Sequence, residues 1–109
     1  MFTLSFSDDF KRDVCSAIDY IKNVLEAPMA AKNHSKEIEK TYLKIEKNPY
    51  RRPLVQNKFL AMRGYRSIKV KNYVIFYVIV EETNTVILHR FLYSRMDWIN
   101  ILMGEFEEN

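Results

Sequence analysis

The sequence predicts an α+β domain in which an antiparallel β-sheet carries a helical hairpin on one face. Residues 73–80 form an uncharged run in which both sets of alternate side chains are apolar. This pattern is typical of a central strand that is covered on both faces. A second strand pattern, 85–93, follows after the polar break 81–84, which indicates a β-hairpin. Two stretches with helical spacing precede these strands. The predicted element order is βααβββα, ending in a short C-terminal helix.

The first half of the chain is predicted to form one strand and two helices. Residues 2–6 alternate apolar and polar side chains, which indicates a short strand. Ser7 is placed to cap a helix that extends to about residue 27 with one apolar stripe. Pro28 suits the first turn of a second helix, which Asn48-Pro49 ends. Helices joined this closely form an antiparallel hairpin.

The second half begins with a long loop, 49–64, in which residues 57–62 suggest one helical turn. A strand is expected over 66–71, followed by a turn at Asn72 and the two strands described above. Ser94 is expected to cap the last helix, whose apolar side contains Trp98, Ile101 and Leu102. The acidic tail 105–109 is expected to fray.

Basic residues are concentrated in one part of the chain. Residues 47–80 contain eight of the 17 basic residues and none of the 14 acidic ones. Along the strand 66–71, Ile68 and Val70 are predicted to face one side of the sheet, and Lys69 and Lys71 the other. The positive electrostatic potential of such a basic region favours anionic partners. We therefore expect the functional surface on the face of the sheet that carries the lysines. The simpler alternative is a solvated basic loop and edge strand.

Length and composition restrict the class of protein. The 109 residues are 48% hydrophobic and 28% charged, as expected for a single domain, 1–109. No apolar run approaches the roughly 20 residues of a membrane span, and acidic residues near the N-terminus argue against a secretion signal, so we expect a cytoplasmic protein. The lone Cys15 excludes an internal disulfide and is expected to be a semi-buried thiol. Neither a metal site nor a cofactor is predicted.

Three motifs resemble one toxin family. Gly64-Tyr65-Arg66, Asn72 to Tyr77 (NYVIFY) and Arg90 to Trp98 (RFLYSRMDW) stand in the order and spacing of the C-terminal half of RelE/ParE superfamily toxins. The N-terminal strand and helical hairpin fit as well, so the resemblance covers nearly the whole chain. It implies the toxin of a type II toxin-antitoxin system, which arrests growth and is neutralised by a cognate antitoxin.

The resemblance leaves the target open. Superfamily toxins either cleave mRNA on the ribosome or inhibit DNA gyrase, so the ribosome with its mRNA, or gyrase, is the implied partner. A third reading is a toxin-like fold that has lost activity and only binds its antitoxin. We expect that antitoxin to present an acidic, amphipathic helix or strand to the sheet face that carries Lys69 and Lys71.

Some positions of the cleaving toxins are filled here and some are not. The resemblance places Lys69 at the basic position on the strand before the hairpin, and Arg95 at the arginine of the turn after the last strand. Val74 and Ile101 stand where a second arginine and a closing tyrosine are expected. The set is incomplete, so whether the chain is a ribosome-dependent endoribonuclease stays open. Arg95 and the following helix N-terminus could together hold one phosphate or carboxylate.

Cleavage of RNA through its 2′-hydroxyl needs a proton acceptor, cations at the phosphate and a proton donor. His89 and Tyr93 are the candidates for proton transfer beside Lys69 and Arg95. Candidates for binding nucleic acid or another target are Arg63, Arg66, Lys71 and Arg90. Strict alternation puts His89 and Tyr93 on one face and Arg90 on the other, unless the strand bulges. The alternatives are a structural role for His89 and an ion pair for Arg90, for which Asp97, otherwise a helix cap, is a candidate partner.

Overall fold

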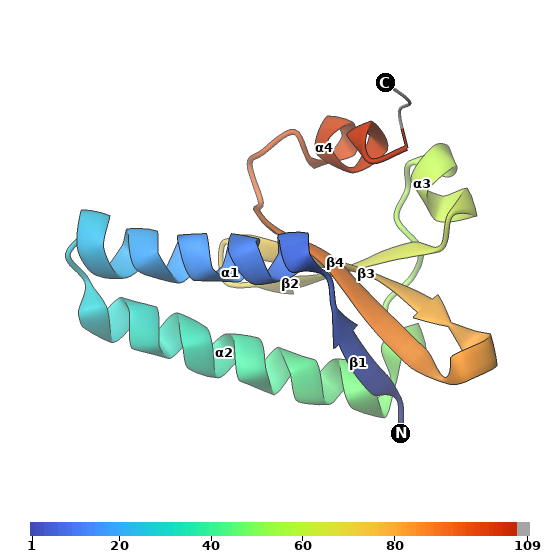
Figure 1. Ribbon diagram of the computed structural model, residues 1–109, viewed down its shortest axis with the longest axis horizontal. Helices are drawn as coiled ribbons and strands as arrows, with labels where there is room; N and C mark the ends of the chain where they lie inside the picture. The colour runs from blue at the N-terminus through green and yellow to red at the C-terminus, as the bar shows by residue number, and fades with distance from the viewer. Residues whose placement is uncertain (107–109) are drawn as a thin grey trace.

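The structure is a computed structural model, and it describes residues 1–106. Its elements are β1 (Thr3–Phe6), α1 (Asp8–Asp19), η1 (Tyr20–Val24), α2 (Pro28–Lys47), η2 (Pro49–Arg51), α3 (Lys58–Met62), β2 (Tyr65–Val70), β3 (Tyr73–Val80), η3 (Glu81–Thr83), β4 (Thr85–Tyr93) and α4 (Trp98–Gly104). The predicted α+β class and element order are confirmed, and the suggested helical turn in the long loop is α3 (Figure 1).

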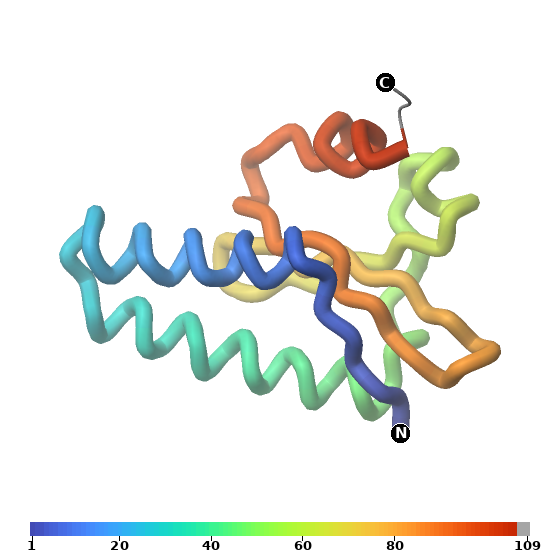
Figure 2. Tube along the Cα trace, in the orientation of Figure 1, coloured from blue at the N-terminus to red at the C-terminus, as the bar shows by residue number. Residues whose placement is uncertain are grey.

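The sheet has four strands in the order β1-β4-β3-β2. β2, β3 and β4 form an antiparallel meander, as predicted. β1 instead pairs parallel with β4, from Thr3 opposite Thr85 to Phe6 opposite Leu88, so the sheet is mixed. No tight turn joins these two strands, and the direction of β1 is therefore not set by a hairpin. Figure 2 shows β1 beside the first half of β4 before the chain turns into α1.

Apolar clusters cover both faces of the sheet. The helical hairpin packs on the face formed by residues such as Ile75, Tyr77 and Leu88, together with Phe10 and Ile45 from the two helices. On the other face lie Tyr65, Phe76, Leu92, Leu60 and Leu102. The last two come from α3 and α4, which therefore close this second face (Figure 1). We expected an open, lysine-bearing surface there, and that expectation is wrong, because the alternate residues of β2 and β3 require apolar cover.

Local signals account for most helix ends. Ser7 caps α1, and its Oγ accepts from the Phe10 N–H at 3.0 Å. The helix then continues only through the π-helical turn η1 and ends at Val24, short of residue 27. α2 begins at Pro28 and ends at Lys47, as predicted. Asn57 caps α3 by accepting from the Leu60 N–H at 3.0 Å.

The C-terminal helix begins later than predicted. Asp97, not Ser94, is its N-cap, and the carboxylate accepts from the Asn100 N–H. Ser94 lies in the preceding turn, where its own N–H donates to the Asn72 carbonyl at 2.8 Å. The expected fraying is also wrong for Glu105 and Phe106, because the Phe106 ring packs edge-on against Tyr65. Residues 107–109 of the predicted tail lie outside the described part of the chain.

Two smaller findings concern the surface. Cys15 is exposed on α1, not semi-buried, because it lies off the apolar stripe that packs on the sheet. Within residues 1–106, no helix combines the length and the apolar character needed to cross a membrane.

Candidate functional site

A β-bulge in β4 sets the positions of the predicted catalytic histidine and its neighbouring arginine. Phe76 pairs with Arg90 but Tyr77 pairs with Leu88, so His89 is the extra residue on the bulged strand. A bulge inserts one residue, so every residue after it points to the opposite face of the sheet from the one that strict alternation predicts. Glu105 follows the end of α4. Its two carboxylate oxygens lie 3.9 Å from the His89 Nδ1 atom and 3.8 Å from the Arg90 Nη1 atom. The two side chains therefore lie on the same side of the sheet, which strict alternation does not allow.

Tyr93 lies on the opposite face. Its ring packs edge-on against Tyr73, with ring centroids 5.7 Å apart, next to the helical hairpin. The expected placement of His89 and Tyr93 on one face is wrong, since the bulge lies between them and reverses the face of the residues that follow it. No proton relay can connect these two residues across the packed sheet.

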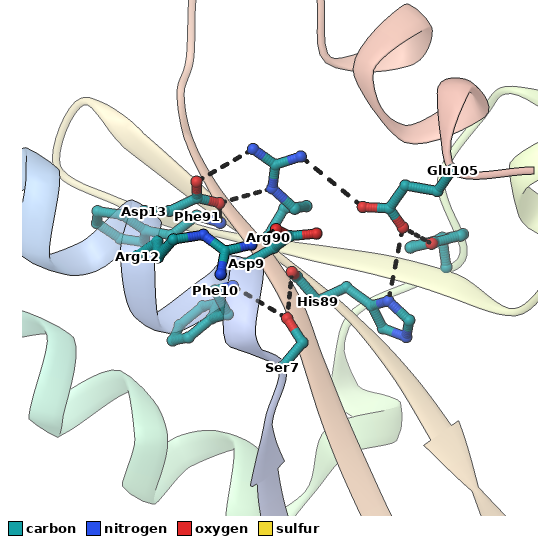
Figure 3. A network of polar contacts seen from close by, with 10 residues as sticks. Ser7, Asp9, Phe10, Arg12, Asp13, His89, Arg90, Phe91 and Glu105 are labelled. Carbon is teal, nitrogen blue, oxygen red and sulfur yellow. Dashed lines mark hydrogen bonds and ion pairs between the residues drawn. The ribbon is translucent and has the colours of Figure 1, made fainter.

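Arg90 forms a bidentate ion pair with Asp13 of α1. Its Nε and Nη2 atoms donate to the two carboxylate oxygens at 2.7 and 3.1 Å. The same carboxylate accepts from the Phe91 N–H at 3.0 Å (Figure 3). The hydrogen bond to Asp13 raises the pKa of Arg90. Of the two alternatives, the structural ion pair is confirmed, although the partner is Asp13 and not Asp97, and its charge is already compensated.

His89 is enclosed between Tyr65 and Glu105. Its ring packs edge-on against Tyr65 with centroids 5.3 Å apart, and burial lowers its pKa. The 3.9 Å to the Glu105 carboxylate is too long for a hydrogen bond. Burial also raises the pKa of Glu105, and it raises that of Tyr65 to about 12. These shifts favour the uncharged forms of all three groups.

The other predicted residues are spread over the surface. Lys69 is exposed on the edge strand β2, Lys71 occupies the left-handed position of the β2–β3 turn, and Arg95 is exposed after β4. Asp97 already caps α4, so its carboxylate competes with any anion at that helix N-terminus. The predicted phosphate site at Arg95 therefore loses the helix contribution.

Two arginines proposed for target binding contact aromatic rings. The Arg63 guanidinium lies 4.4 Å from the ring centre of Phe59 and 4.3 Å from that of Phe106. Arg66 lies over the Tyr50 ring at 5.3 Å. Such contacts hold a guanidinium flat while leaving its charge uncompensated. Arg63 lies close to the packed pair Tyr65 and His89, because the Phe106 ring under its guanidinium also packs against Tyr65. Arg66 lies instead over Tyr50.

An apolar groove lies at the tip of the helical hairpin and was not predicted. It has a volume of about 610 Å³ and lies between η1, the start of α2, the β2–β3 turn and the end of β4. Its walls include Tyr20, Leu25, His34, Tyr73 and Tyr93. Val24 and Met29 add further exposed apolar surface nearby. The available signal in the sequence was Val24 and Met29, two apolar residues outside the predicted apolar stripes.

Exposed apolar side chains gather at this groove and not on the lysine-bearing face of the sheet. The sheet face beyond Lys69 is filled by α3 and α4, so exposed apolar side chains gather instead at the hairpin tip. Asn72, next to Lys71, contributes to the groove. A soluble monomer rarely leaves several large apolar side chains exposed in one place unless they contact another molecule.

Comparison with known proteins decides the family. Residues 4–98 match the family model described as the ParE toxin of the type II toxin-antitoxin system parDE. The chain belongs to the ParE toxin family. This confirms the resemblance to the RelE/ParE superfamily and makes the protein a toxin of the type II class, with a cognate antitoxin as its partner. A comparison with curated protein sequences gave no match.

Solved structures share the fold of this ParE-family toxin. One from the chromosomal ParDE toxin-antitoxin system of P. aeruginosa superposes with a TM-score of 0.66 at 14% identity, covering 85% of this chain and 96% of the other. The toxin-antitoxin complex RelBE2 from Mycobacterium tuberculosis gives 0.60 at 18% identity, covering 84% and 96%. The isolated E. coli RelE toxin gives 0.56 at 13% identity, covering 98% and 100%. At these identities the likeness concerns the fold alone.

Proposed function

We propose that this ParE-family toxin arrests growth by binding and inhibiting DNA gyrase, without cutting RNA, until its antitoxin neutralises it. One observation carries the choice between the two mechanisms. Of the four residues predicted for catalysis, Lys69 lines one cavity and Tyr93 lines another, and neither His89 nor Arg95 lines either of these two cavities. An inhibitor that acts by binding needs no such centre.

The chemistry of RNA cleavage supports this choice. A base, an acid and cations must all reach one phosphate in the transition state. His89 packs against Tyr65 and lies near Glu105 on one face of the sheet, whereas Tyr93 lies on the other face beside the helical hairpin. The charge of Arg90 is compensated by Asp13. Lys69 and Arg95 can supply positive charge to a phosphate, but cleavage also needs a base for the 2′-hydroxyl.

The antitoxin is expected at the groove of the hairpin tip. Its exposed apolar walls suit the apolar face of an amphipathic helix, which inserts residues spaced one helical turn apart. Lys71 and Lys22 lie beside this apolar surface in the chain and are exposed, so acidic residues at the edges of such a helix would find cations. Covering these apolar side chains would also make the complex more soluble than the free toxin.

Two assays on the purified toxin test the mechanism. We expect loss of gyrase-catalysed DNA supercoiling at toxin concentrations that leave mRNA intact in a translation extract, as read by primer extension. Cleavage at the ribosomal A site without an effect on supercoiling would overturn the proposal. If both assays are negative while the antitoxin still binds, the chain is a binding module that has lost its activity.

A variant of Arg95 gives a second test in cells. Because Arg95 is exposed and forms no ion pair within residues 1–106, Arg95→Ala is expected to fold normally. Under the gyrase proposal the variant still inhibits supercoiling and arrests growth at matched expression. Arrest that disappears together with A-site cleavage would identify Arg95 as a catalytic cation instead.

A further inference from the structure

A second concave surface lies away from the hairpin tip. This cavity of about 330 Å³ lies where the last turns of α2, the η2 turn and the edge strand β2 meet. Lys44, Arg51, Arg52 and Lys69 line it, together with the buried side chains of Ile45 and Tyr77. No acidic residue lines the cavity. Four cations therefore surround one small space.

Nothing in the described chain compensates these four charges. The ion pairs formed within residues 1–106 involve Asp9, Asp13, Glu37 and Glu105, none of which contacts the cavity. Glu81 of η3 is engaged elsewhere, because it accepts from the Tyr50 hydroxyl at 2.7 Å. Like charges that share a low-dielectric concavity raise the potential inside it and favour an anion there.

Hydrogen bonds to the sheet hold the Arg52 guanidinium and the backbone of η2, which carries Arg51. The Arg52 Nε donates to the Ser67 carbonyl at 3.2 Å, which fixes the guanidinium on the edge of β2. The Arg66 guanidinium donates to the Arg52 carbonyl, and the Tyr77 hydroxyl donates to the Pro49 carbonyl at 2.8 Å. These bonds tie η2 and the following residues to the sheet. A ligand would meet a preformed site, which reduces the entropy lost on binding.

The open edge of β2 adds a backbone donor. Val70 and Tyr73 pair across a two-residue turn, so the backbone groups of the alternate residues point outward. The Tyr65 carbonyl confirms this pattern by accepting from the Val55 N–H at 3.0 Å, outside the sheet. The N–H of Lys69 points outward by the same alternation, and it is available next to the cavity.

We propose that this cavity binds the phosphate groups of a nucleic acid. Arginine and lysine together with main-chain N–H groups are the usual ligands of phosphodiester oxygens. A single carboxylate would leave most of the four charges uncompensated, whereas consecutive phosphates place several negative charges along one line. The basic residues also continue beyond the cavity at Lys47, Arg66 and Lys71, all exposed or partly exposed.

The apolar lining argues for nucleic acid over a protein segment. Protein partners usually anchor through exposed aromatic or aliphatic side chains. Ile45 and Tyr77 of this cavity are almost fully buried, and only the half-buried Ile68 could offer an apolar anchor. Exposed apolar residues are instead found at the hairpin tip, where the antitoxin is expected. The two surfaces therefore differ in the chemistry that they recognise.

The test measures binding of the full-length chain to a short fluorescent DNA duplex and to a single-stranded RNA, by anisotropy over a range of salt. Lys44→Glu/Lys69→Glu reverses two charges of the cavity, and Lys32→Glu/Lys36→Glu reverses two exposed lysines elsewhere on α2. We expect the cavity variant to lose about tenfold in affinity or more, with a salt slope smaller by about 2, and the control to lose much less. Circular dichroism checks that both variants fold.

A charge-conserving variant, Lys44→Arg/Lys69→Arg, should retain binding. Equal losses of affinity in the two glutamate variants would overturn the proposal. They would show that binding depends on the net charge of the protein and not on a specific site. ATP or inorganic phosphate that competes at the concentration of oligonucleotide phosphates would assign the cavity to small phosphates instead. Binding of a poly-glutamate peptide, but of neither oligonucleotide, would assign it to an acidic protein segment. The outcome is independent of the supercoiling assay, because binding is measured without gyrase.

Discussion

Asp13 and Arg90, which lie 77 positions apart in the chain, join α1 to β4 through a single carboxylate. One Asp13 oxygen accepts both from the Arg90 Nε at 2.7 Å and from the Phe91 N–H at 3.0 Å (Figure 3). β1 stops pairing with β4 at Leu88. Beyond this point the edge of β4 would expose unpaired backbone groups, and side chains of the N-terminal segment cover them instead.

Asp13→Ala is expected to destabilise the fold. The side chains of Asp13 and Arg90 are only 16% and 21% exposed, so the variant leaves a mostly buried guanidinium and a backbone N–H without an acceptor. The expected loss is about 2–3 kcal/mol in the free energy of unfolding, measured with urea. Asp9→Ala, which removes the partner of Arg12 in an exposed pair, is the matched control and should cost less than about 1 kcal/mol. Equal losses would show that the Asp13 bonds contribute no more than a surface pair.

His89→Gln should change how stability depends on pH. Burial lowers the pKa of His89 from 6.5, so the unfolded chain binds its proton more readily than the folded one. The wild type therefore loses stability as the pH falls from 6.5 toward the folded-state pKa, and keeps it above 6.5. The variant lacks this loss. We expect the two stability curves to run parallel above pH 6.5 and to converge below it.

Glu105 contributes with the opposite sign and at lower pH. Burial raises its pKa above 4.5, so the folded state holds this proton more tightly and stability falls as the pH rises through that interval. Because both curves contain this contribution, the difference between wild type and His89→Gln isolates the histidine. Curves that stay parallel down to acidic pH would show that the ring is solvated in the folded protein.

Leu102→Ala tests the closure of the second sheet face. Leu102 of α4 is fully buried against Tyr65, Phe76 and Leu92. Truncation should cost about 2–5 kcal/mol, because α4 cannot collapse into the cavity without losing its other contacts. Leu43→Ala, on the exposed side of α2, should change stability by no more than about 0.5 kcal/mol. A neutral Leu102→Ala would mean that this face is open in solution, as we first expected.

Leu25→Asp is expected to weaken antitoxin binding. Leu25 is 55% exposed and lines the groove at the hairpin tip, where a charge would have to be desolvated beneath an apolar helix. We expect a loss of about tenfold or more in affinity by calorimetry or surface plasmon resonance. Leu43→Asp introduces the same change at a leucine that is 63% exposed and outside the groove, and it should bind normally. Equal loss in both variants, or in neither, would place the antitoxin elsewhere.

Patterns within a few residues were sufficient to predict most of the elements. The apolar run 73–80 is the central strand, Pro28 begins α2, and Ser7 caps α1. These features depend on the spacing of side chains along one helix or strand and on hydrogen bonds to the nearest backbone groups. The family resemblance rested on the same kind of short, ordered motifs, and the family match confirms it.

The site depended on contacts that no local pattern contains. One inserted residue at His89 reverses the parity of everything after it in β4, and so separates His89 from Tyr93. Asp13 became the partner of Arg90 only because α1 docks along the free edge of β4. The same holds for the second face of the sheet. This face is filled because α3 and α4 dock on it. The apolar strand residues indicate that a cover is needed, but they do not specify which segment provides it.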